Sequence, residues 1–327
     1  MRYRRRILAM ILIYVSGGWI ALPPCAAFAR SASGAATGGV AVGAQYDTTH
    51  VYVAPDDLDA FVASFTATFG GKPSARIVTN VLPVPSQTQF RFIATPVGTL
   101  STFAFLTPIP YPFGQERTGY LVNDMDRALA AAQHAGAEII VEKFKDPIGV
   151  DAVIQWPGGI KMQLYWHTDA PNYAPLESIP DNRIYESRDA ASAFVNDFVR
   201  FSHGRIVSDN PRADAIEIGR PNESFRRLRI ESVFGKMQVL VTDGHLPYPF
   251  GHEITGYAVS DVAATLNKAR ASGAKVLYGP VLGDDRTSAM IKFPGDYIAE
   301  VHASTGLQPN RMRRIAHNAC SGVRSGG

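Results

Sequence analysis

The sequence has few cysteines and no long hydrophobic run. Only 2 of its 327 residues are cysteine, so it is not a disulfide-stabilised miniprotein. With 46% hydrophobic and 19% charged residues, its composition is that of a globular protein and excludes collagen and coiled coils. The longest apolar stretch, residues 7–22, is shorter than the roughly 18–20 residues that a membrane-spanning helix needs. The length predicts about two domains.

Several catalytic signatures are also missing from the sequence. It contains no G-x-S-x-G, H-E-x-x-H, P-loop or G-x-G-x-x-G motif. Because each motif supplies the nucleophile, metal ligands or phosphate cradle of its enzyme class, their absence disfavours a serine hydrolase, a zinc protease and a nucleotide-dependent enzyme.

The N-terminus has the order of a secretory signal. Arg2 and three further arginines precede the apolar stretch 7–22, which is followed by two prolines and the small-residue site that ends at Ala29. We therefore expect residues 1–29 to be removed and the mature protein to be periplasmic or secreted. An uncleaved N-terminal anchor and a lipid anchor on Cys25 are the alternatives.

The basic charge of the chain comes from its two ends. The formal charge is +3, but residues 1–29 hold four arginines and no acid, so their removal leaves 28 Lys+Arg against 29 Asp+Glu. Residues 306–327 hold four more arginines and residues 30–44 one, so residues 45–305 carry a net charge of −6. Nucleic acid is therefore not an expected partner.

The one basic cluster lies at residues 226–229. On a strand, Arg227 and Arg229 would share one face and Arg226 would take the other. We interpret this cluster as a solvated sheet edge, where charged side chains are common.

An internal repeat divides the chain. Residues 110–114, Pro-Tyr-Pro-Phe-Gly, recur at 247–251, and the same offset of 137 aligns the Thr-Gly-Tyr that begins at Thr118 with the one at Thr255. Two homologous halves are the simplest explanation. The predicted organisation is a signal at 1–29, a flexible leader at 30–44, halves at 45–170 and 180–305, and a disordered basic tail at 306–327.

Each half contains two strand-helix-strands passages. In the first, an alternating strand at 49–53 precedes a helix that starts at Leu58 and stops at Gly70. In the second, a strand at 119–122 precedes a helix capped by Asp124 or Asp126. Three further strands follow each helix, so the chain predicts an α+β fold of four βαβββ modules.

These features resemble the vicinal oxygen chelate superfamily, which includes glyoxalases, bleomycin-resistance proteins and extradiol dioxygenases. The resemblance rests on the strand with His50 and its Asp-rich cap, and on three motifs that span residues 118–124, 134–137 and 151–159. It implies that paired modules curl into two cup-shaped mixed sheets. It also implies chemistry at an oxygen-bearing small molecule.

The resemblance implies a divalent metal (Fe, Mn or Zn) held by one residue from each of three strands. In the first half these positions fall on His50, Arg117 and Gln163, and only His50 is an ordinary ligand. In the second half they fall on Arg183, Ile254 and Glu300. Neither set is complete, and we expect Arg183 and Glu300 to form an ion pair inside the second cup.

Neighbouring residues offer two alternative metal sites. One is formed by Glu300, His302 and His252, and the other by His50, Glu116 and Gln163. No cofactor is therefore assigned, and both sites remain open hypotheses.

Two functions remain open. As a lyase, isomerase or dioxygenase, the first cup would use His50 as a base or ligand, Gln163 to orient the substrate and Arg117 to pair with an anionic group. As a metal-free protein that sequesters an antibiotic-like compound, the cups would only bind it. The expected cup-facing binding residues are Arg183, Glu300, His302 and Tyr165. A monomer is sufficient, a dimer stays open, and no membrane contact is expected after signal cleavage.

Overall fold

The computed structural model describes residues 39–81 and 83–305. The expected signal at 1–29 and the tail at 306–327 lie outside the described residues. The last residues of the expected leader are packed, because Val40 is 4% exposed and Ala41 bridges Val122 beside strand β6 (Thr118–Leu121). No helix in the described part of the chain is long and apolar enough to cross a membrane.

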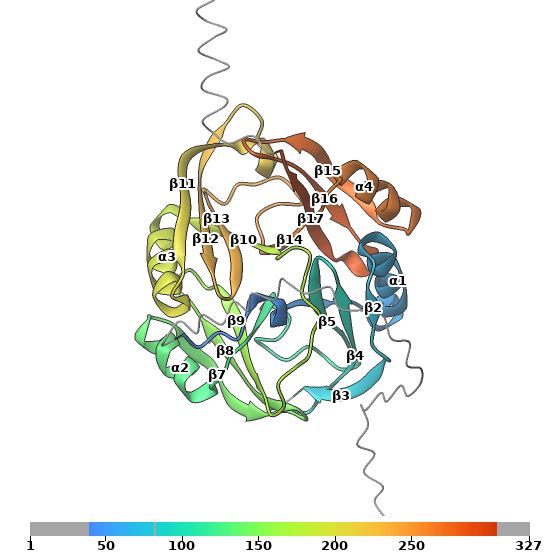
Figure 1. Ribbon diagram of the computed structural model, residues 1–327, viewed down its shortest axis with the longest axis vertical. Coiled ribbons are helices and arrows are strands. Elements are labelled where there is room, and N and C mark those ends of the chain that lie inside the picture. Colours follow the sequence, from blue (N-terminus) through green and yellow to red (C-terminus); the bar gives the residue numbers. More distant parts are fainter. Residues whose placement is uncertain (1–38, 82, 306–327) are drawn as a thin grey trace, which may run out of the picture. The chain divides into compact units, whose positions relative to one another are not determined.

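The first half forms a nine-stranded mixed sheet. Its order is β2-β4-β5-β1-β6-β9-β8-β7, and β3 pairs with β4 (Figure 1). Strand β1 pairs in parallel with β5 and antiparallel with β6, so the two modules join along β1 and β6. The strands are β1 (Thr48–Tyr52), β2 (Lys72–Pro73), β3 (Ile77–Val81), β4 (Ser86–Thr95), β5 (Gly98–Phe105), β6, β7 (Glu138–Lys145), β8 (Gly149–Gln155) and β9 (Lys161–His167).

The second half repeats this topology in eight strands. Its order is β11-β12-β13-β10-β14-β17-β16-β15, and β10 takes the place of β1. The predicted four βαβββ modules and two curled mixed sheets are confirmed. The strands are β10 (Asp181–Ser187), β11 (Arg205–Asp214), β12 (Ser224–Ser232), β13 (Gly235–Thr242), β14 (Ile254–Ala258), β15 (Lys275–Leu282), β16 (Arg286–Lys292) and β17 (Ile298–Ser304).

Each module has one α-helix, and local sequence sets its ends. The predicted stop at Gly70 is confirmed, since this residue adopts a φ of 79° that glycine tolerates. Asp124, rather than Asp126, caps the second helix by accepting a hydrogen bond from the amide of Arg127. The helices are α1 (Leu58–Phe69), α2 (Met125–His134), α3 (Arg188–Ser202) and α4 (Val262–Ala271).

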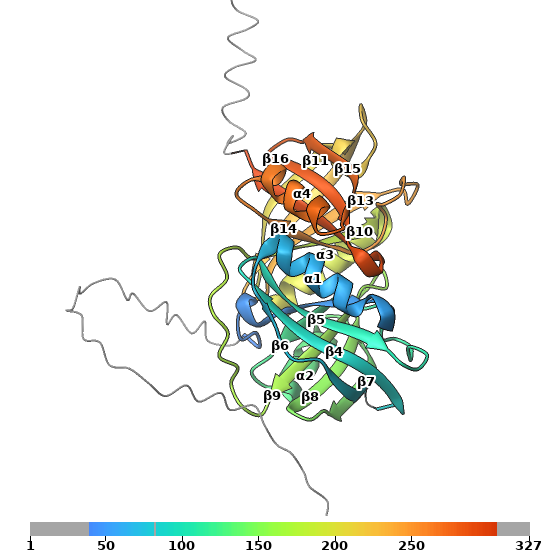
Figure 2. The same cartoon turned by 90° about the vertical axis from the view of Figure 1, so that its right-hand side faces the viewer.

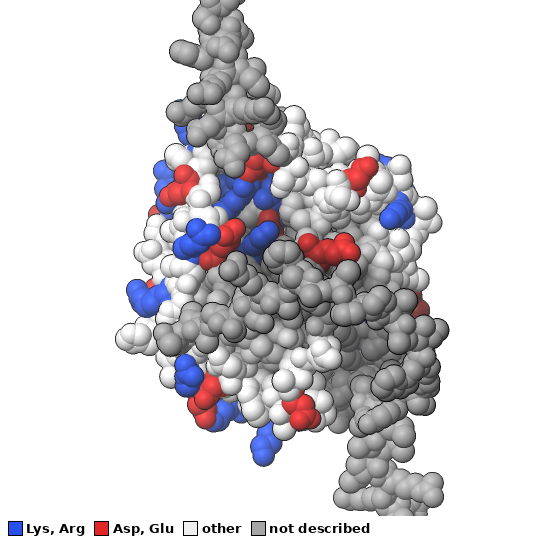
Figure 3. Space-filling model, in the orientation of Figure 1, with Lys and Arg blue, Asp and Glu red and all other residues white. Residues whose placement is uncertain are grey.

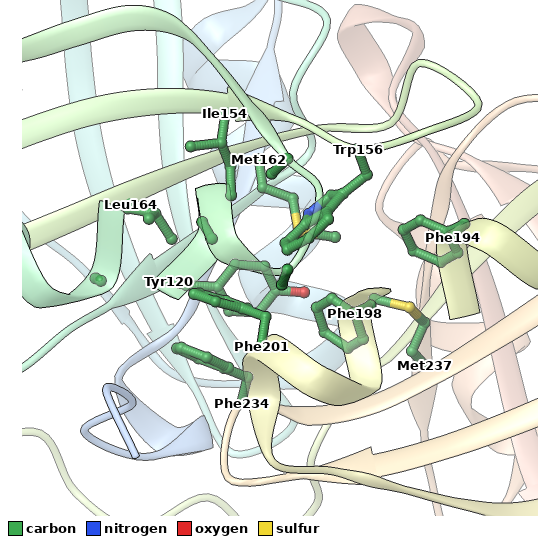
Figure 4. Close-up of a cluster of buried hydrophobic side chains, with 14 of the residues drawn as sticks. Tyr120, Ile154, Trp156, Met162, Leu164, Phe194, Phe198, Phe201, Phe234 and Met237 are labelled. Carbon is green, nitrogen blue, oxygen red and sulfur yellow. The ribbon is translucent and has the colours of Figure 1, made fainter. Parts of the chain in front are cut away.

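The helices pack across the two halves. Helix α1 lies beside α4, and their side chains share one buried cluster that includes Phe65 and Leu266 (Figures 1 and 2). Helices α2 and α3 share a second cluster, in which Trp156 and Phe198 meet edge to face with ring centroids 6.0 Å apart (Figure 4). Because these clusters take one face of each sheet, the other, concave face is left for the interior of each cup.

Strand alternation decides which side chains enter a cup. On β1, Val51 joins the buried cluster of α1 and α4, while His50 and Tyr52 take the other face. On β10, Ile184 joins the cluster of α2 and α3, while Arg183 takes the concave face.

The interpretation of residues 226–229 as a solvated edge is wrong. Strand β12 pairs with β11 on one side and β13 on the other, so it is not an edge. Alternation holds, because Arg226 is exposed and pairs with Asp209 while Arg227 is only 3% exposed. Local sequence could not show that β11 pairs with this strand or that the buried Glu217 lies beside Arg227.

Candidate functional site

The concave face of the first sheet carries a row of aromatic rings. The rings of Tyr52 and Phe103 stack with centroids 5.3 Å apart, and Phe90 lies at the same distance from Phe103. Phe105 continues the row beyond Tyr52. Together these rings form an apolar wall, and Tyr52 and Phe103 also pack against the buried cluster of Phe105, Phe113 and Val153. Aromatic walls of this kind bind planar organic molecules.

His50 lies at the foot of this wall beside two polar groups. Its Nδ1 is 3.5 Å from Oε1 of Glu116, and the hydroxyl of Tyr52 donates a hydrogen bond to the same carboxylate. Glu116 is fully buried and its Oε2 accepts no hydrogen bond from a described residue. An imidazole with a carboxylate beside one of its nitrogens has the components of a general base and its orienting group.

Glycine makes room for the imidazole. A Cβ atom on Gly119 would lie 2.6 Å from Nε2 of His50. Because real Cβ atoms do not approach so closely, this position of β6 must lack a side chain if His50 is to keep its place. The strand pairing puts Arg117 opposite His50, whose amide donates to the carbonyl of Arg117.

Arg117 contacts a backbone carbonyl and an aromatic ring. Its Nη1 donates to the carbonyl of Gly114 at 2.8 Å, and its guanidinium lies over the ring of Tyr52 at 5.7 Å. It forms no ion pair with a residue in the described ranges. Arg117 therefore presents a cation without a counter-charge.

Gln163 and Tyr165 lie on β9, at the other side of the cup. Gln163 is in register with Gly119 on the neighbouring strand. Burial raises the pKa of Asp151 well above its usual range, with Asp146 adding to the shift and a hydrogen bond from Gln163 opposing it. The hydroxyl of Tyr165 donates to the carbonyl of Tyr46. The predicted residues thus share one concave face, although their roles stay predictions.

The second cup contains the expected ion pair. Nη1 of Arg183 lies 2.5 Å from Oε1 of Glu300, and both side chains are at most 1% exposed. Burial opposes the charged form of Glu300, but the adjacent guanidinium outweighs it and holds the pKa of Glu300 well below its usual range. The prediction of this pair is confirmed.

Further charges surround that pair. Arg286 pairs with Asp181 at 3.0 Å, and His302 lies between Glu300 and Asp181, at 3.4 Å and 3.7 Å. Gln238 donates to Asp181 at 3.0 Å. The predicted residues Arg183, Glu300 and His302 therefore meet, but they are bound to one another.

Two further arginines of β12 also form ion pairs in the second half. Arg227 donates to the buried carboxylate of Glu217 and lies 3.4 Å from Asp284. Arg229 donates to Asp285. On the face shown in Figure 3, basic and acidic side chains likewise lie side by side over the second half. These contacts make the second cup a network in which the buried charges are paired with opposite charges.

The donor atoms do not fit a metal ion of the expected kind. Arg183 is a permanent cation and fills the space beside Glu300, while Arg117 cannot coordinate. Within residues 39–81 and 83–305, no three His, Cys, Asp or Glu side chains are grouped as a metal site needs. His252 lines a cavity with His50, away from the proposed partners Glu300 and His302.

That cavity lies where the halves meet. It has a volume of about 110 Å³ and takes walls from β1, from Arg117, and from the start of β14 and β17. Glu253 lines it, and its Oε1 is buried without a hydrogen bond to a described residue. Burial raises the pKa of Glu253 to about 8, with Glu116 adding to the shift and Arg117 opposing it.

Sequence reasoning did not select Glu253. The signal was present, because the repeat offset of 137 aligns it with Glu116. That the two equivalent loops approach each other across the halves depends on how the sheets pack, which the repeat alone does not give.

A second, open groove of about 860 Å³ borders the second cup. Tyr185, Ile218 and Phe225 line its apolar part. Arg220, which lines the groove, forms ion pairs with Glu223 and with Asp243, and the distance to Asp243 is 2.8 Å.

Solved structures share this arrangement at low sequence identity. One is a variant of 4-hydroxymandelate synthase from Streptomyces coelicolor, with a TM-score of 0.57, 12% identity, and coverage of 85% of this chain and 97% of that one. The chain has the fold of the vicinal oxygen chelate superfamily. No protein-family model matches the sequence, and no curated protein matches it.

Two further structures have the same vicinal oxygen chelate fold. The Mn(II)-bound glyoxalase from Novosphingobium aromaticivorans has a TM-score of 0.52 and 12% identity, over 81% of this chain and 82% of that one. Homoprotocatechuate 2,3-dioxygenase from Arthrobacter globiformis has a TM-score of 0.51 and 13% identity, over 83% of each chain. At these identities the similarity supports the fold, and the chemistry must be argued from the side chains.

Proposed function

We propose that the first cup binds a small oxygen-bearing organic molecule and that His50 exchanges a proton with it. The observation that supports this most is the position of His50 beside Glu116, to which Tyr52 also donates, at the foot of an aromatic wall. The solved structures of the same fold include a glyoxalase and a dioxygenase, so oxygen-bearing small molecules are the substrate class we propose.

The proposed proton transfer uses only side chains. Glu116 lies 3.5 Å from Nδ1 of His50 and would orient the imidazole from that side, which leaves Nε2 to take a proton from the bound molecule. Arg117, which has no counter-charge, would stabilise the negative charge that develops on the substrate oxygen. The proton then returns to a different atom, as in an isomerisation, and no co-reactant is needed.

Binding is tested with catechol as the probe. We expect isothermal titration to detect catechol on the wild type, and Phe103→Ala to weaken the binding by about tenfold or more because the wall loses its central ring. Phe225→Ala removes a buried ring from the second cup and serves as the matched control. Equal losses in both variants, or no binding to the wild type, would contradict the proposal.

Metal analysis tests the side-chain mechanism separately. We expect the purified protein to contain less than stoichiometric iron, manganese or zinc, because the donor set is incomplete. A stoichiometric metal that is lost in His50→Ala would contradict the proposed proton transfer and would indicate a metal-dependent reaction.

Sequestration without turnover is the second candidate function. The stacked rings of Tyr52, Phe103 and Phe105 support it, since such a wall binds an aromatic antibiotic-like compound without a reaction. His50→Gln separates the two functions. If the compound is only held, the variant binds catechol as tightly as the wild type and no compound from a panel of keto and enol acids is converted by either.

We also propose that the protein acts outside the cytoplasm. The order of charged, apolar and small residues in 1–29 supports export. Mass spectrometry of the protein from a fractionated bacterial host should find Arg30 as the first residue, in the periplasm or medium. An intact N-terminus in the cytoplasmic fraction would contradict export, and a lipid on Cys25 would indicate an anchored form.

A further inference from the structure

The cavity between the halves has the size of a small ligand. Its volume of about 110 Å³ is smaller than the cavity of roughly 150 Å³ that holds benzene in an engineered protein. A molecule of about four or five non-hydrogen atoms therefore fits. The apolar part of the lining comes from Ile254 and Ile298.

The charges around the cavity leave one cation unpaired. Asp296 is engaged by Lys292 at 2.6 Å, and Glu116 accepts from Tyr52 and faces His50. Arg117 lines the cavity, uses one nitrogen on the carbonyl of Gly114, and makes no ion pair with a described residue. A guanidinium with free donors on a cavity wall favours an anion with two oxygens.

Glu253 adds the complementary group. It lines the same cavity, and its buried Oε1 has no hydrogen-bond partner among the described residues. Burial raises the pKa of this carboxyl to about 8, so near neutral pH it carries a proton that it can donate. A protonated carboxyl beside a guanidinium presents donors to both oxygens of a carboxylate.

We propose that this cavity binds the carboxylate of a small organic acid of about two or three carbons, with Arg117 on one oxygen and Glu253 donating to the other. This inference rests on the proposed function, because His50 and Tyr52 line the same cavity. It assigns the acid group of the ligand to a site to which both halves contribute, and it makes Glu253 a binding residue from the second half.

The test is propionate binding, measured by isothermal titration on the full mature chain. We expect Arg117→Met and Glu253→Met each to weaken propionate binding by about tenfold or more, since each removes one donor. Glu253→Gln keeps a neutral donor and should bind within about threefold of the wild type. The matched controls, Arg200→Met and Glu142→Met, change exposed residues outside the cavity and should bind as the wild type does.

Three results would overturn the inference. The first is no propionate binding by the wild type, and the second is propionate binding by Arg117→Met and Glu253→Met that is as tight as that of the wild type. The third is a loss in Glu253→Gln together with tighter binding of ethylammonium than of propionate. The last result would mean that Glu253 acts as a charged carboxylate toward a cation. Thermal unfolding of each variant identifies a loss that comes from misfolding.

The failure of this inference is distinguishable from the failure of the proposed function. Catechol binding that survives in Glu253→Met while propionate never binds would leave the first cup as proposed and remove the carboxylate site. Propionate binding with the expected variant pattern, but no catechol binding, would support the carboxylate site and contradict the proposed binding on the aromatic wall.

Discussion

The two halves have the same strand register and different interiors. His50 on β1 and Arg183 on β10 occupy equivalent places, as do Gln163 on β9 and Glu300 on β17. In the second half the pair at these places is a buried ion pair, and in the first it is a histidine and a glutamine. A shared backbone therefore holds two unrelated sets of side chains.

The side chains that line the two cups also differ between the halves. Phe90 pairs with Phe103 across β4 and β5, while at the equivalent places of the second half Arg227 pairs with Leu240. Arg227 is bound by Glu217, so the charge introduced into the second cup comes with its partner. The buried charges of the second cup are thus paired with opposite charges, whereas Arg117 beside the first cup forms no ion pair with a described residue. Buried atoms without a hydrogen bond from the described residues occur in both cups, among them Nδ1 of His50 in the first and Nδ1 of His302 in the second.

The comparison teaches where to look for function. Buried polar atoms that fail to bond one another cost free energy unless a ligand or water bonds them. Both cups contain such atoms, so charge pairing is what distinguishes them. Because Arg117 faces the adjoining cavity without an ion-pair partner among the described residues, the first cup and that cavity are where we expect a ligand.

Breaking the buried ion pair should have the largest effect. Arg183→Met leaves Glu300 charged and buried, so we expect a loss of about 3–5 kcal/mol in the free energy of unfolding. Urea denaturation measures it, with Arg226→Met as the control, because Arg226 is exposed. A loss no greater than that of the control would show that the second cup does not depend on this pair.

Replacing both partners sharpens the same comparison. In Arg183→Met combined with Glu300→Leu no buried charge is left unpaired between these two residues, so we expect the double variant to recover about 2 kcal/mol or more of the loss. A double variant less stable than Arg183→Met would mean that the wider network of Arg286, Asp181 and His302 needs Glu300 for itself.

The two buried carboxyls should respond to pH with opposite signs. The pKa of Glu300 is lower in the folded than in the unfolded chain, so its contribution to stability is full above the unfolded pKa, about 4.3, and declines as pH falls below it. The pKa of Glu253 is raised to about 8, so its burial favours folding at low pH and this contribution declines as pH rises toward 8.

Denaturation at several pH values checks these signs. Glu300→Gln should flatten the stability profile on the acidic side, and Glu253→Gln should flatten it from about pH 4.3 to 8. A variant of Glu253 whose profile follows that of the wild type over this range would contradict the raised pKa.

The smallest effect is expected on the outer side of the second sheet. Arg226 and Asp209 are both about two-fifths exposed, so solvent screens their ion pair. Arg226→Gln should change the free energy of unfolding by about 1 kcal/mol or less. Arg227 is the next residue and lies on the buried face of the same strand, so Arg227→Gln should cost about 3 kcal/mol or more. Similar losses for both would mean that Arg227 is not the buried partner of Glu217.

The sequence was sufficient for the fold because its signals are local or repeated. The glycine at Gly70 and the cap at Asp124 depend only on nearby residues, and the offset of 137 relates one half to the other. The ion pair of Arg183 and Glu300 was also predictable, since strand alternation and the resemblance place both in one cup.

The cavity and the charge network were not predictable in the same way. Glu253 meets Arg117 only because the halves pack together, and Arg227 meets Glu217 only because a loop after β11 folds over the sheet. Such contacts join segments that only tertiary packing brings together. Neither hydrophobic periodicity nor motif spacing predicts how these segments pack.

Each helix packs on the sheet of its own half and also shares a buried cluster with a helix of the other half. Helix α1 is buried against α4, and α2 shares its cluster with α3, so neither half alone covers its helices completely. A single break in the connection at residues 168–180 would leave two fragments, each with two apolar helix faces that match the other. Fragments expressed together should therefore reassemble, and either one expressed alone should aggregate.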